Sequence, residues 1–118
     1  MALQIYCGKG FDTQKAERFF KERRIAYQRV DVLKYGIGRR ELESVAAAVG
    51  LDALCDRESK AFRESVIAYT QDRETILSGL MDRPQLLRLP IVRCGRLATA
   101  GVCPEVWERW IAEGKTKS

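Results

Sequence analysis

Histidine is absent from this chain of 118 residues, and its four cysteines are widely separated with no Cys-x-x-Cys pair. Zinc sites in proteins are usually built from histidine and closely spaced cysteine ligands, so we expect no metal site. The cysteine spacing also gives no framework of the kind that staples small secreted domains. We therefore expect four reduced thiols: Cys7, Cys55, Cys94 and Cys103.

Long apolar runs are also missing, and the first residues lack the basic and apolar regions of a signal peptide. We expect a cytoplasmic protein with no membrane partner. Lysine and arginine number 21 against 16 acidic residues, a net charge of +5. The basic residues alternate with acidic ones, as in Lys15-Ala16-Glu17-Arg18, which is typical of solvated helix faces. We therefore expect no direct nucleic-acid binding, and a monomer with a single core.

The first third of the chain has the pattern of a β-α-β unit. Alternating residues predict a strand near 3–6, and apolar residues at helical spacing predict a helix over about 13–24 with Asp12 as its N-cap. A second strand is predicted over 26–32. Such a unit implies parallel strands and a right-handed crossover.

The middle of the chain, about 38–83, is predicted to be helical, with Gly50 ending one helix. Strands are then predicted at 91–93 and 97–100, joined by a turn at 94–96. Pro104 begins a last helix whose apolar side includes Trp107 and Trp110, which we expect to be buried.

The element order is therefore β-α-β, several helices, then β-β-α, which is the layout of a thioredoxin-like α/β domain with a mixed four-stranded sheet. We interpret 1–118 as one domain, with the core at 1–37 and 84–113 and a helical insertion at about 38–83. Pro90 precedes the third strand, where thioredoxin-like folds carry a cis-proline facing the active-site loop.

In its order of elements and in several short motifs the chain resembles the arsenate reductase (ArsC) family, which includes the Spx-type transcription regulators. The resemblance covers about residues 3–111. Its carriers are Ile5-Tyr6, Asp12-Thr13, Lys15-Ala16, Gly50-Leu51, Ser59-Lys60-Ala61-Phe62, Pro84, Leu86-Leu87, Pro90-Ile91-Val92, Gly101 and Glu105-Val106-Trp107.

The resemblance implies a nucleophilic cysteine in the first loop, with glutathione and glutaredoxin completing the reduction of arsenate. That position corresponds to Phe11, or to Gly10 if one residue is deleted. The arginines that hold the oxyanion are displaced as well. Glu58 with Arg57 beside it, Leu89 preceded by Arg88, and Cys103 stand at or near their positions. We expect ordinary arsenate reduction to be impaired.

Cys7 is the nearest remaining thiol and the candidate catalytic residue. If the glycine-containing loop brings it to the helix terminus beside Lys9, its pKa should be lowered. The alternative is a cysteine packed in the core at the end of a strand. Cys94 or Cys103 could serve as a resolving thiol. The candidate anion-binding residues are Gly8, Lys9, Gly10, Phe11, Asp12, Arg57, Arg88 and Pro90.

Two functions follow from these residues. The first is a thiol oxidoreductase with a degenerate site, no bound cofactor, and a small oxyanion or glutaredoxin as partner. The alternative is a non-catalytic Spx-like module that contacts the α subunit of RNA polymerase. The Spx-type Cys-x-x-Cys switch corresponds to Phe11 and Gln14, so that switch is excluded. Gly50 matches a glycine that those regulators use in polymerase binding.

Overall fold

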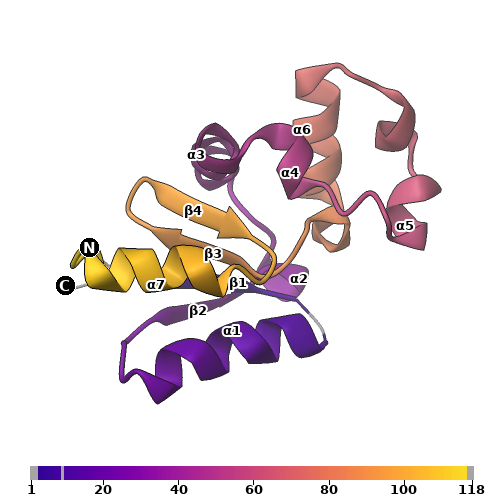
Figure 1. The fold of residues 1–118 in the computed structure, drawn as a ribbon. Coiled ribbons are helices and arrows are strands. Elements are labelled where there is room, and N and C mark those ends of the chain that lie inside the picture. Colours follow the sequence, from indigo (N-terminus) through magenta and orange to yellow (C-terminus); the bar gives the residue numbers. More distant parts are fainter. Residues whose placement is uncertain (1–2, 9, 117–118) are drawn as a thin grey trace.

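A computed structural model of the protein describes residues 3–8 and 10–116. Its sheet has four strands in the order β2-β1-β3-β4, in which β1 pairs with β2 in parallel and β3 pairs with both β1 and β4 in antiparallel fashion. The thioredoxin-like α/β arrangement predicted from the sequence is confirmed (Figure 1). The elements are β1 (Leu3–Cys7), α1 (Phe11–Glu22), β2 (Gln28–Asp31), α2 (Val32–Tyr35), α3 (Arg39–Val49), α4 (Leu51–Leu54), α5 (Lys60–Arg63), η1 (Val66–Tyr69), α6 (Arg73–Asp82), η2 (Pro84–Leu86), β3 (Ile91–Cys94), β4 (Leu97–Ala100) and α7 (Pro104–Ala112).

One face of the sheet is covered by α1 and α7. Because side chains alternate along a strand, Leu3, Ile5 and Cys7 all point into this layer. Phe20 of α1 and Trp107 of α7 meet there, with ring centroids 5.2 Å apart. Trp107 and Trp110, which the sequence predicts to be buried, are both buried. Packing in this core fixes the direction in which the side chain of Cys7, the last residue of β1, points.

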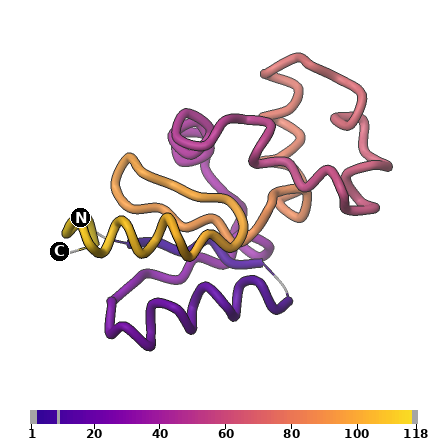
Figure 2. Tube along the Cα trace, in the orientation of Figure 1, coloured from indigo at the N-terminus to yellow at the C-terminus, as the bar shows by residue number. Residues whose placement is uncertain are grey.

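The opposite face of the sheet packs against the helices between β2 and β3. Tyr6 and Ile91 belong to this second core, together with Leu42 and Val45 of α3. The chain leaves the sheet after α2, forms α3 to α6, and returns through η2 to β3 (Figure 2). Helices α3 to α6 therefore lie to one side of the sheet, and the carboxyl ends of β1 and β2 lie beside this helical layer (Figure 1).

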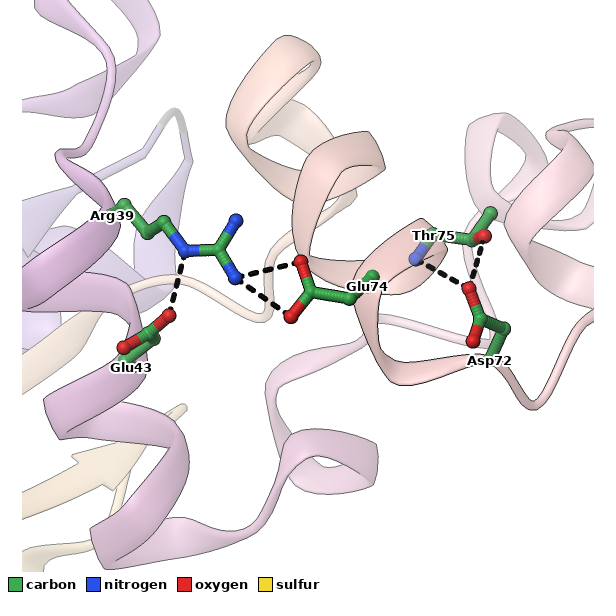
Figure 3. Close-up of polar contacts among 5 residues, drawn as sticks. All are labelled: Arg39, Glu43, Asp72, Glu74 and Thr75. Carbon is green, nitrogen blue, oxygen red and sulfur yellow. Dashed lines mark hydrogen bonds and ion pairs between the residues drawn. The ribbon is translucent and has the colours of Figure 1, made fainter.

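Helices α3 and α6 are joined by a charged bridge (Figure 3). Arg39 of α3 donates to Glu43 at 2.7 Å and to both carboxylate oxygens of Glu74 at 2.7 and 2.6 Å. Asp72 caps α6, because its Oδ2 accepts from the backbone N–H of Thr75 at 3.1 Å. The ion pairs therefore hold α3 and α6 together within the helical layer.

Two predicted boundaries differ from the structure. Helix α1 begins at Phe11 after Gly10, so Asp12 lies in the first turn and is not the N-cap. The second strand ends at Asp31, whose side chain accepts from the N–H of Lys34 at 3.3 Å and so caps the unexpected helix α2. A capping aspartate stops the strand before Val32. The Leu89–Pro90 peptide bond is cis, as the thioredoxin-like layout predicts. Within the described ranges, no helix is long and apolar enough to cross a membrane.

Candidate functional site

The first loop connects β1 to α1 at the carboxyl end of the parallel strand pair. The N–H of Gly8 donates to Oγ1 of the buried Thr13 at 3.0 Å, which ties the loop to the first turn of the helix. Gly10 precedes α1 with a φ of 101°, a conformation that glycine adopts without the steric cost other residues meet. Lys9, one of the candidate anion-binding residues, lies outside the described residues.

Cys7 points away from this loop and into the core between the sheet and α1. Its side chain is 1% exposed, and its thiol donates to the carbonyl oxygen of Ile5 at 3.5 Å. Burial raises the pKa of Cys7, and the positive charge of Arg29 only partly opposes this effect. Of the two alternatives that the sequence left open for Cys7, its burial corresponds to the cysteine packed in the core at the end of a strand. The physical reason is strand alternation, which places Cys7 on the same face as Ile5.

Phe11 occupies the start of α1, where the resemblance expects a nucleophilic cysteine. Its side chain is 78% exposed. With Gln14, Lys15 and Arg18, one and two turns further along the helix, it lines a shallow depression on the surface. The start of α1 therefore presents an exposed aromatic ring at the position where the resemblance expects a thiol.

The loop before β3 lies directly against the first loop. A Cβ atom placed on Gly8 would lie 2.8 Å from Cδ1 and 2.9 Å from Cβ of Leu89, so glycine permits this close approach. Pro90 is buried, and its carbonyl oxygen accepts from the N–H of Gly101 at 2.9 Å. The structure therefore places the predicted site residue Gly8 against Leu89, the residue that precedes the predicted site residue Pro90.

The two candidate arginines are positioned by other partners. Nε and Nη2 of Arg57 both lie 2.7 Å from Oδ1 of Asp52, so this guanidinium is already paired with a carboxylate. Arg88 is exposed, and its aliphatic stem runs beside Gly101. Among the described residues, no hydrogen bond or ion pair joins either arginine to the first loop. Burial raises the pKa of Cys55 and Cys103, and the charge of Arg88 only partly opposes this effect.

Cys94 does not form a dithiol with Cys7. Cys94 pairs with Leu3 across the sheet, four residues from Cys7 along β1, which corresponds to about 13 Å. A disulfide needs Cα atoms less than about 7 Å apart, so Cys94 is excluded as its resolving thiol. Cys55 is buried. Cys103 is half-buried before α7. In the described part of the chain, no cluster of histidine, cysteine and carboxylate side chains could hold a metal ion.

A polar cluster that the sequence analysis missed lies on the other face of the sheet. Arg93 of β3 donates through Nη1 to the hydroxyl of Tyr6 and through Nη2 to Oγ of Ser44, both at 3.4 Å. Gln4 accepts from the Tyr6 hydroxyl at 3.3 Å. The available signal was an arginine inside the strand Ile91-Val92-Arg93-Cys94, at a position that alternation directs toward the helical layer.

Solved structures share this fold over nearly the whole chain. An arsenate reductase from Vibrio cholerae matches with a TM-score of 0.82 at 21% identity, covering 92% of this chain and 97% of that one. A putative arsenate reductase from Yersinia pestis has a TM-score of 0.80 at 18% identity, covering 91% and 98%. A putative ArsC family related protein from Bacteroides fragilis has a TM-score of 0.80 at 21% identity, covering 92% and 98%.

No protein-family model matches the sequence, and no curated protein does either. The chain therefore has the thioredoxin-like fold of the arsenate reductase-related structures, at a sequence identity that establishes the fold alone.

Proposed function

We propose that this protein is a cytoplasmic member of the ArsC family that binds a protein partner and has lost the family's loop-thiol chemistry. The observation that carries the proposal is which side chains are exposed and which are buried at the first loop. The exposed residue at the start of α1 is Phe11, whereas the nearest thiol, Cys7, is buried in the core. A nucleophilic cysteine must be accessible to its substrate and must ionise to the thiolate. The burial of Cys7 opposes both.

The surface around Phe11 suggests the chemistry of the partner. Lys15 and Arg18 line the same depression, and neither belongs to an ion pair among the described residues. Two uncompensated cations beside an aromatic ring suit an acidic protein surface that offers an apolar side chain. The α subunit of RNA polymerase, implied by the Spx-type resemblance, is the first partner to test.

Gly50, the residue matched to the polymerase-binding glycine, provides a second contact to examine. It ends α3 with a φ of 90° and is exposed, and no atom lies within 4 Å of a Cβ placed on it. Its structural role as a helix terminator is complete without a partner. Substitution at Gly50 therefore tests partner binding only if stability is measured in parallel.

The test is recovery of the polymerase α subunit from host lysate, followed by binding of the purified proteins. Phe11→Ala should weaken binding at least tenfold, and Lys15→Glu with Arg18→Glu should weaken it further as charges repel. Tyr69→Ala is the matched control, because Tyr69 is 87% exposed on η1 at a different surface. Equal binding by wild type and Phe11→Ala would refute a contact at this surface.

The enzymatic alternative is examined with the same protein. Arsenate reduction is measured with glutathione and glutaredoxin, and Cys7→Ser is the matched variant. We expect no turnover above the uncatalysed rate. Turnover that disappears in Cys7→Ser, or capture of glutaredoxin in a mixed disulfide with Cys7, would replace the binding proposal with an oxidoreductase.

A further inference from the structure

We propose that Arg93, Ser44 and Tyr6 form a binding site for a phosphoryl oxyanion on the sheet face that packs against the helical layer. The three side chains come from β3, α3 and β1 and meet at the guanidinium of Arg93. This site is separate from the surface at Phe11. Arg93 pairs with Gln4, three residues before Cys7, so it lies about 10 Å back along β1 and on the opposite face.

The charge of Arg93 is uncompensated. Its three acceptors are the hydroxyls of Tyr6 and Ser44 and the carbonyl oxygen of Gly95, all electrically neutral. None of the ion pairs among the described residues includes Arg93. Removing a charged group from water without a counterion is unfavourable, so a half-buried guanidinium in this setting favours the binding of an anion.

The contacts of Arg93 are also weak enough to be exchanged. Its donor–acceptor distances are 3.3, 3.4 and 3.4 Å, which lie beyond the usual range for N–H donors. An oxyanion would accept two parallel N–H bonds from the guanidinium, the arrangement in which arginine binds phosphate most strongly. The hydroxyl groups of Ser44 and Tyr6 can rotate to donate to it.

Solvent reaches this cluster. Arg93, Ser44 and Gln4 are each half-buried, and Gln28 at the neighbouring strand is exposed. The amide of Gln4 donates to Gln28 at 3.1 Å, which continues the polar line from Ser44 to the edge strand β2. Helix α3 packs over β4, at the other edge of the sheet. A small anion can therefore approach Arg93 along the polar side chains of β1 and β2.

The experiment is a titration with inorganic phosphate followed by NMR, using the Arg93 Nε–H and the backbone amides of Ser44 and Gln4. We expect saturable shifts with a millimolar dissociation constant. Sodium chloride at equal ionic strength should not reproduce them. Arg93→Gln should weaken binding at least tenfold, and Ser44→Ala should weaken it severalfold. Arg83→Gln is the control, because Arg83 is an exposed arginine at the end of α6.

A parallel titration with glycerol phosphate distinguishes two sources of the anion, free phosphate and the phosphate group of a larger molecule. If the ester binds more tightly than inorganic phosphate, the ligand is the phosphate group of a larger molecule. Equal affinity of wild type and Arg93→Gln, or identical shifts with chloride, would overturn the site. If Arg93→Gln fails to fold, an unchanged affinity in Ser44→Ala overturns it. Partner binding through Phe11 is measured separately and does not depend on this result.

Discussion

Gly8 lies so close to Leu89 that a single added methyl group would overlap the leucine, at 2.8 Å from Cδ1 and 2.9 Å from Cβ. This relationship joins the loop after β1 to the segment that contains the cis Leu89–Pro90 bond. We predict that Gly8→Ala destabilises the protein by about 1–3 kcal/mol through overpacking, as measured by urea denaturation. Leu89→Ala removes Cδ1 and Cγ but keeps the Cβ atom 2.9 Å away, so Gly8→Ala should cost less in that background and still be destabilising. Equal costs in both backgrounds would contradict the contact.

The hydrogen bond between Trp107 and Thr99 gives a second prediction. The indole Nε1–H donates to Oγ1 of Thr99 at 2.8 Å in a fully buried site that links α7 to β4. Thr99→Val removes the acceptor and leaves the indole N–H unsatisfied, so we expect a loss of about 1–3 kcal/mol of stability. Thr99→Ser keeps the hydroxyl and should retain more of it. If the Thr99→Val variant were as stable as the Thr99→Ser variant, this hydrogen bond would contribute little to stability.

The raised pKa values of the thiols lead to a prediction of how stability varies with pH. Burial raises the pKa of Cys7, Cys55, Cys94 and Cys103 in the folded protein. A raised folded pKa contributes stability that is complete below the unfolded value of about 8.5 and is lost as the pH rises through the folded value. Burial also raises the pKa of Tyr27 to about 12, which extends the same trend.

Under reducing conditions, we therefore expect the free energy of unfolding to be lower at about pH 10 than at about pH 7.5. Each thiol can contribute at most about 1.4 kcal/mol per pH unit. Urea denaturation across this range measures the slope. Cys7→Ala should make it shallower, although its absolute stability is lower because of the cavity. An unchanged slope would show that Cys7 ionises as easily in the folded protein as in the unfolded chain.

The sequence was sufficient for the fold because local patterns and topology agreed. Alternation in β1, helical spacing in α1 and α7, and Pro90 before β3 all indicate the same thioredoxin-like layout. Helix α2 was missed because Asp31 can continue a strand or cap a helix, and the choice depends on its hydrogen bond to Lys34.

The site was harder to predict than the fold. The absence of a cysteine at positions 10 and 11 is visible in the sequence, but the direction of the Cys7 side chain depends on the register of β1. The sequence places Arg57 among the candidate anion-binding residues, whereas the structure pairs it with Asp52. An arginine inside β3 is a local signal of a polar cluster, but its contact with Ser44 cannot be derived from it, because Ser44 lies 49 residues away in the chain. Long-range contacts of this kind cannot be derived from local patterns.

The most direct test of the loss of loop-thiol chemistry is alkylation of each cysteine in the reduced protein with iodoacetamide at about pH 7.5, followed by peptide mass spectrometry. The half-buried Cys103 should react first, and Cys7 should react as slowly as the buried Cys55 and Cys94. Guanidinium chloride should make all four react at similar rates, which controls for intrinsic reactivity. A Cys7 that is labelled fastest in the folded protein would contradict the loss of the reactive thiol and restore Cys7 as the nucleophile.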